Sequence, residues 1–267
     1  MADFSFVPNT TKYQPANALS LGRAASLAYE GKQKITKEAG AWGFDKVQYF
    51  DRNGTQAFVA GNEEMIVVAF RGTQPDKLQD WVSDADFKLV TGPMGQVHEG
   101  FYRALRQVWR ELRKTIDKFQ DRGQSLWMTG HSLGAALATL AVAILRADDK
   151  PVHGLYTFGQ PRCGDRSFEQ SFNADFKPRC FRFVNNNDIV TRVPLRAMNY
   201  SHVGTFLYFN KDGDLTDDLH WWYQFLDSVG GRIEDLGKPG TDGLKDHSMD
   251  RYLKWLQKNI NVNPFKN

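Results

Sequence analysis

The most constraining feature of this 267-residue chain is a serine that lies between two glycines and is enclosed by two apolar runs. Residues 125–129 form a short apolar run, the pentapeptide Gly130-His131-Ser132-Leu133-Gly134 follows, and an alanine- and leucine-rich run continues to Leu145. The first run is typical of a buried strand and the second of a buried helix. Glycines two positions before and after the serine leave room for a sharp turn. The pattern therefore predicts a strand–turn–helix with Ser132 at the turn.

The order of elements around this turn predicts the fold class. A G-x-S-x-G pentapeptide between a strand and a helix is the nucleophile elbow of α/β-hydrolases. An Asn-Gly hairpin near residue 53 and the buried strand Met65 to Phe70 precede it, and we expect further strands over 155–158, 180–184 and 205–209. Helices are predicted over 15–29, 101–119, 165–176 and 249–256. This alternation predicts a mostly parallel sheet flanked by helices on both faces, in a single domain over residues 1–267.

Composition excludes several classes of function. Lys and Arg number 34 and Asp and Glu 31, and their even distribution gives no reason to expect a nucleic-acid partner. Phosphate-binding, dinucleotide and complete metal-binding patterns are lacking, so we expect no cofactor and no metal. Two cysteines, Cys163 and Cys180, favour buried reduced thiols, with one bridge left open. The first ten residues lack a signal-peptide pattern, which predicts a cytoplasmic protein or a secreted one with its signal removed.

A serine nucleophile requires a base, and in this fold the chain order is serine, acid, histidine. Asp188 follows the predicted strand 180–184 and is the candidate acid, although an aspartate in this place also caps turns. His247 precedes the last predicted helix and is the candidate base. His202 is the competing histidine, and we interpret it as a structural hydrogen-bonding residue. In this hypothesis His247 takes the proton of Ser132 and Asp188 orients the imidazole ring.

Two backbone N–H groups are needed to stabilise the oxyanion that such a reaction forms. Leu133, which follows the nucleophile, supplies one of them in this fold. Thr73 is the candidate for the other, because it lies in the turn after the strand Met65 to Phe70. The alternative for Thr73 is an ordinary capping residue at a strand end.

Several motifs in a fixed order together resemble the class 3 lipase family, which comprises the fungal-type triacylglycerol lipases and their bacterial relatives. They are FRGT at 70–73, VHEGF at 97–101, GHSLG at 130–134, TFGQPR at 157–162, NDIV at 187–190 and DHS at 246–248. The resemblance extends from about Leu21 to Leu256. It implies a triad of Ser132, Asp188 and His247, with Thr73 and Leu133 at the oxyanion hole.

The resemblance also implies a lid over Gln74 to Phe87, in which Asp80, Trp81 and Val82 are the candidate lid residues. The implied activity is carboxylic ester hydrolysis through an acyl-serine, by a triacylglycerol lipase in the first place. An esterase of feruloyl or short-chain type, a phospholipase, and a non-catalytic lipid-binding protein on a hydrolase scaffold are the alternatives. The expected partner is a lipid or small-molecule ester, with transient contact to a lipid interface, and the oligomeric state stays open. The aromatic segment Leu219 to Leu236 fits either a core helix or a second flap.

Overall fold

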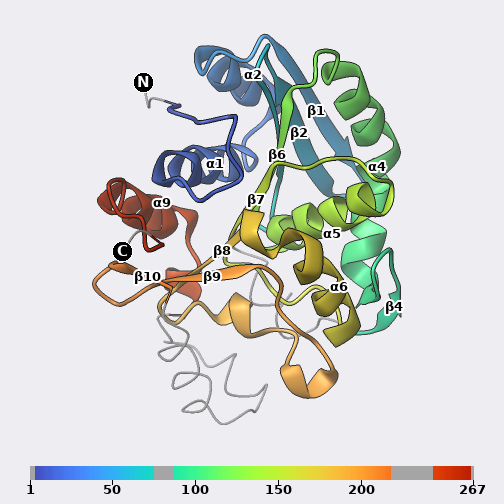
Figure 1. The fold of residues 1–267 in the computed structure, drawn as a ribbon, viewed down its shortest axis with the longest axis vertical. Coiled ribbons are helices and arrows are strands. Elements are labelled where there is room, and N and C mark those ends of the chain that lie inside the picture. Colours follow the sequence, from blue (N-terminus) through green and yellow to red (C-terminus); the bar gives the residue numbers. More distant parts are fainter. Residues whose placement is uncertain (1–3, 75–86, 218–242, 266–267) are drawn as a thin grey trace.

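The computed structural model describes residues 4–74, 87–217 and 243–265 (Figure 1). A central sheet of eight described strands has the order β1-β2-β3-β6-β7-β8-β9-β10. Its strands are β1 (Lys46–Arg52), β2 (Thr55–Gly61), β3 (Met65–Phe70), β6 (Ser125–His131), β7 (Gly154–Phe158), β8 (Cys180–Asn185), β9 (Thr205–Phe209) and β10 (Leu215–Thr216). The five strands from β3 to β9 are parallel, whereas β1, β2 and β10 are joined antiparallel at the two edges. The predicted mostly parallel sheet is thus confirmed.

Strand β3 explains why its sequence is apolar at every position. All six of its residues are buried. Ile66, Val68 and Phe70 belong to the hydrophobic core on one face of the sheet, and the alternate residues from Met65 to Ala69 belong to the core on the other. Successive side chains of a strand point to opposite faces, so a strand covered on both sides has no position for a polar residue.

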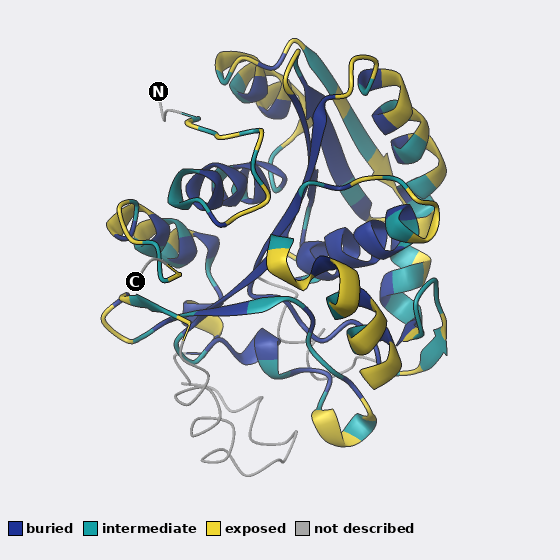
Figure 2. Ribbon diagram, viewed as in Figure 1, coloured by how far each residue is buried: buried dark blue, intermediate teal, exposed yellow. Residues whose placement is uncertain are grey.

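Helices cover both faces of the sheet (Figure 1). The core on one face includes residues of α4 (Glu99–Phe119), α5 (Leu133–Ala147) and α6 (Arg166–Phe176). The core on the other face includes residues of α1 (Pro15–Leu27), α2 (Lys32–Ala41) and α9 (Met249–Lys258). The central strands and α5 are buried along most of their length (Figure 2). None of the helices in the described ranges is long and apolar enough to cross a membrane.

The structure adds elements that the sequence patterns did not predict. These are α2, the short edge strand β10 and a two-stranded ribbon of β4 (Leu89–Thr91) and β5 (Gln96–His98). Helix α4 begins at Glu99, two residues earlier than predicted, because the His98 side chain accepts a hydrogen bond from the Phe101 N–H at 3.4 Å and caps the helix. Short helices η2 (Lys177–Arg179), η3 (Ile189–Arg192), η4 (Arg196–Met198) and α8 (Gly243–Asp246) complete the described elements.

Both cysteines lie inside the protein. Cys163 and Cys180 are free and fully buried in the core that α4, α5 and α6 cover. Burial raises the pKa of the Cys163 thiol to about 12, and it raises that of Cys180 as well. Two buried neutral thiols, rather than a bridge, therefore occupy these positions.

Candidate active site

Ser132 stands at the turn between β6 and α5, as the sequence predicts. Its backbone has a φ of 58° and a ψ of −131°, a conformation that non-glycine residues rarely adopt. Gly134 allows the following helix to approach the sheet, because a Cβ at this position would lie 2.2 Å from the Phe70 carbonyl oxygen. The strained turn places the serine at the carboxyl end of β6 and at the amino end of α5.

Asp188 follows β8 and is fully buried. Its Oδ1 accepts a hydrogen bond from the Val190 N–H at 3.0 Å, and its carbonyl oxygen accepts one from the Thr191 hydroxyl at 2.8 Å. Both carboxylate oxygens lie 2.9 Å from His247 Nδ1. The residue therefore caps η3 and also contacts His247, while its role as the catalytic acid stays a prediction.

Tyr252 is a partner of Asp188 that sequence reasoning missed. Its hydroxyl donates to Asp188 Oδ2 at 2.6 Å and accepts from the Asn185 N–H at 3.0 Å. Burial, together with the nearby charge of Asp188, raises the pKa of Tyr252 well above 10, so the hydroxyl keeps its proton and stays a donor. The helical periodicity of α9 predicts only that Tyr252 points inward.

His247 is 2 % exposed and donates Nδ1–H to Asp188, which leaves Nε2 as the acceptor in the neutral ring. Among the described residues, neither His247 Nε2 nor Ser132 Oγ has a hydrogen-bond partner. The turn at Gly159 lies next to both residues. The Phe158 carbonyl accepts from the Ser132 N–H at 3.0 Å, and a Cβ on Gly159, whose φ is +59°, would lie 2.7 Å from the His247 ring.

His131 fixes the backbone of His247. Its Nε2 lies 2.6 Å from the His247 carbonyl oxygen, and its Nδ1 lies 2.7 Å from the Tyr29 hydroxyl. A carbonyl oxygen only accepts, so Nε2 carries the proton and Nδ1 accepts from Tyr29. Burial, and secondarily His247, lowers the pKa of His131 well below 6.5, which keeps the ring neutral. The sequence order excludes His131 as the base but gives no sign of this positioning contact.

Asp246 connects the loop that contains Asp188 to the loop that contains His247. Its buried carboxylate accepts from the Asn186 amide at 2.9 Å and from the Asn187 N–H at 3.2 Å, and it forms an ion pair with Arg251. Its carbonyl oxygen accepts from the Asn185 side chain at 2.7 Å. The chain segment before His247 is thereby held against the segment before Asp188.

The candidate oxyanion donors lie beside the serine. Leu133 is the first residue of α5. The turn before Thr73 touches the nucleophile, since a Cβ at Gly72 would lie 3.0 Å from Ser132 Cβ. Thr73 also lines a hollow of about 350 Å³ that reaches His247 and Tyr29. The donation of hydrogen bonds to an oxyanion by Thr73 and Leu133 stays a prediction.

Further predictions concern the lid, the aromatic segment and His202. The proposed lid residues Asp80, Trp81 and Val82 lie outside the described residues, as does the aromatic segment at 219–236. His202 donates from Nε2 to the Thr191 carbonyl oxygen at 2.9 Å, which agrees with its interpretation as a structural histidine. No group of three or more His, Cys, Asp or Glu side chains that could hold a metal ion occurs within the described ranges.

The parallel sheet, the strained serine turn and the buried histidine–carboxylate pair define an α/β-hydrolase. The sequence profile of class 3 lipases matches residues 67–198. Over these residues the chain has the sequence of a class 3 lipase.

Named relatives agree with this assignment. Triacylglycerol lipase OBL1 of Arabidopsis thaliana is 28 % identical over 70 % of this chain and 48 % of its own length. Phospholipase A1-II 4 of Oryza sativa subsp. japonica is 31 % identical over 74 % of this chain and 57 % of its own. The solved structure of Rhizomucor miehei triacylglyceride lipase is 27 % identical, with a TM-score of 0.63 over 73 % of this chain and 80 % of that one. The chain spans about half the length of the curated relatives.

Proposed function

We propose that this protein is a serine carboxylic ester hydrolase that cleaves acylglycerols, and in the first place a triacylglycerol lipase. The observation that carries the proposal is the pairing of His247 Nδ1 with Asp188 at 2.9 Å, beside a strained Ser132. His247 Nε2 and Ser132 Oγ are both buried, and neither atom has a hydrogen-bond partner in the described ranges. Such an arrangement suits proton transfer between these two atoms and has no use in a protein that only binds lipid.

In the proposed reaction, Ser132 Oγ attacks the ester carbonyl carbon while His247 Nε2 takes the hydroxyl proton. Asp188 stabilises the imidazolium, and the N–H groups of Leu133 and Thr73 stabilise the oxyanion of the tetrahedral intermediate. The intermediate expels the alcohol, which receives the proton from His247. A water molecule then attacks the acyl-serine with the same histidine as base and releases the fatty acid.

The names of the relatives support a lipid ester as substrate, because they include a triacylglycerol lipase and a phospholipase A1. Phospholipid cleavage is therefore the second candidate function. We also propose that the protein contacts a lipid surface transiently, since long-chain esters are presented there. Hydrolysis of a triolein emulsion, of phosphatidylcholine vesicles and of a soluble p-nitrophenyl ester ranks the three substrate types.

Labelling by an alkyl phosphonate tests the proposal directly. We expect one covalent adduct on Ser132, detected by mass spectrometry of the peptide. The Ser132→Ala variant should fold, fail to label and lose at least about a thousandfold in kcat. Ser26→Ala serves as the control, because Ser26 lines the hollow next to His247 and has no proposed role in the reaction. An unlabelled Ser132 in a folded protein, or a Ser132→Ala variant with a tenth of the activity, would contradict the mechanism.

A further inference from the structure

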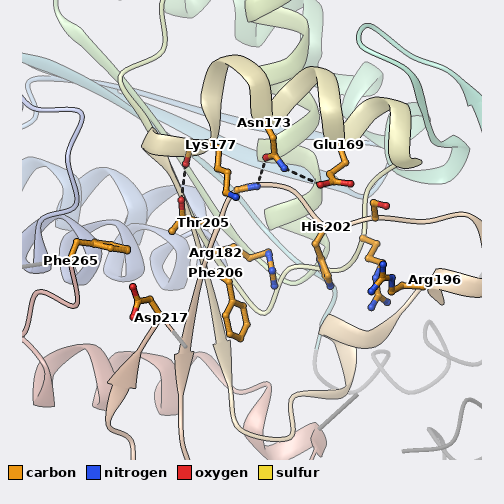
Figure 3. Close-up of a pocket in the computed structure, with 13 residues that line it drawn as sticks. Glu169, Asn173, Lys177, Arg182, Arg196, His202, Thr205, Phe206, Asp217 and Phe265 are labelled. Atoms are coloured by element: carbon orange, nitrogen blue, oxygen red, sulfur yellow. Dashed lines mark hydrogen bonds between the residues drawn. The ribbon is translucent and has the colours of Figure 1, made fainter. Parts of the chain in front are cut away.

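A second hollow lies away from the proposed ester site, between α6, β8, β9 and the segment that follows Asp188 (Figure 3). Its volume is about 310 Å³. None of the proposed triad or oxyanion residues lines it. Four basic side chains do, namely Arg162, Lys177, Arg182 and Arg196, against two acidic ones, Glu169 and Asp217. The residues that line the hollow therefore carry a net positive charge.

Arg162 is the buried member of this group. It is 3 % exposed, and its guanidinium donates from one terminal nitrogen to the carbonyl oxygens of Arg192 and Pro194. Its Nε is buried without a hydrogen-bond partner, and no carboxylate in the described part of the chain forms an ion pair with it. Burial, and the nearby charges of Arg182 and Arg196, lower the pKa of Arg162 to about 9. A buried cation that lacks a counter-ion is costly, so this site favours an anion.

The two acidic side chains offset only part of this charge, because four basic side chains line the same hollow. Glu169 accepts a hydrogen bond from the Asn173 amide at 3.3 Å, and Asn173 is held in turn by the Gly204 N–H at 2.8 Å. Asp217 lies at the other end of the hollow, near Phe265 (Figure 3). Arg196 lies away from Asp217 (Figure 3), is exposed on η4 and is accessible from solvent.

We propose that this hollow binds a phosphate group. Guanidinium groups present paired N–H donors that match phosphate oxygens, and Arg162, Arg182 and Arg196 together suit the charge of about −2 that a phosphate monoester carries at neutral pH. Arg196 provides the donor at the entrance and Arg162 the buried donor behind it. The phosphate belongs either to a soluble phosphate compound or to the headgroup of a phosphorylated lipid, and both present the same group to the arginines.

The test uses the full chain and inorganic phosphate. Titration calorimetry at constant ionic strength, with chloride as the reference anion, gives the Kd. Arg196→Gln should weaken phosphate binding by about tenfold, which corresponds to the loss of one charge-assisted hydrogen bond. Arg166→Gln is the matched control, because Arg166 is also an exposed arginine nearby on α6 but does not line the hollow. Both substitutions are at exposed positions, and thermal melting without phosphate verifies that both variants fold.

A second experiment distinguishes a soluble phosphate compound from a lipid headgroup. Phosphatidylcholine vesicles with and without phosphatidic acid are sedimented with Ser132→Ala protein, so that no lipid is cleaved. Retention that depends on phosphatidic acid, on Arg196 and on the absence of free phosphate assigns the site to a lipid headgroup. Binding of free phosphate without vesicle retention assigns it to a soluble compound. The proposal is overturned by the absence of saturable phosphate binding, or by equal weakening in the Arg196 and Arg166 variants.

Discussion

At the scale of single residues, the carboxylate of Asp188 accepts hydrogen bonds from three donors, and Tyr252 is the one whose removal is most informative. Tyr252→Phe deletes only the hydroxyl that lies 2.6 Å from Oδ2. We expect kcat to fall by about tenfold, since a hydrogen bond to a charged group is worth roughly 1.5–3 kcal/mol.

The measurement is kcat/KM for a soluble ester at neutral pH. Tyr13→Phe is the control, because Tyr13 is also buried but packs among aromatic rings away from Asp188. Equal rates for the two variants would show that the hydroxyl of Tyr252 has no part in positioning Asp188.

The residues predicted from the sequence are those with a local signature. Ser132 has its pentapeptide, and the chain order then selects Asp188 and His247. Tyr252 and Tyr29 have no such signature, because their contacts join residues 64 and 102 positions apart in the chain. Only the folded structure brings these hydroxyl groups to the site.

At the scale of elements, the loop after β8 and the loop before α9 are held together by Asp246. We expect Asp246→Asn to lower both the melting temperature and kcat, because the neutral amide accepts less strongly from Asn186 and Asn187 and loses the ion pair with Arg251. Hydrogen bonds to a charged group predict a loss of about 1–3 kcal/mol in unfolding free energy. Denaturant unfolding and ester hydrolysis provide the two measurements.

Asp250→Asn is the matched control for this substitution, since Asp250 is exposed in the first turn of α9. A stability and a rate equal to those of the control would mean that other contacts hold the two loops together.

Elements were predictable where burial imposes a period on the sequence. The five buried positions of α4 from Leu105 to Phe119 recur at helical spacing, and β3 is apolar throughout. The sequence pattern did not predict helix α2, because this helix buries only Ile35 and Ala39 and carries Gly40 near its end. The ribbon of β4 and β5 has three residues in each strand, which is too short for a repeating pattern.

At the scale of the whole molecule, two neutral histidines, the buried His131 and the half-buried His202, make stability depend on pH. Burial lowers the pKa of His131 and of His202 well below 6.5. Below this value the unfolded chain binds protons that the folded protein does not, so stability is lost as pH falls and is complete above the unfolded pKa. We expect the unfolding free energy to decrease from about pH 7.5 to about pH 5.5, by at most ~1.4 kcal/mol per pH unit for each histidine.

Urea unfolding at the two pH values measures this dependence. His202→Gln should reduce the slope, because it removes one of the two titrating groups while leaving an amide that donates to the Thr191 carbonyl. A wild-type stability that is constant over this range would show that the two rings accept protons in the folded protein as readily as in the unfolded chain.

The hydrogen-bond chain from Tyr29 through His131 to the His247 carbonyl has a consequence for biosynthesis. It connects the turn after α1 with the loop before α9, and the two helices also pack against each other. On the ribosome, the serine turn is synthesised well before His247 and Tyr252. A nascent chain that ends between Ser132 and His247 holds the serine without its proposed base and without the tyrosine that contacts Asp188. The proposed ester hydrolysis therefore has to wait until synthesis has passed residue 252.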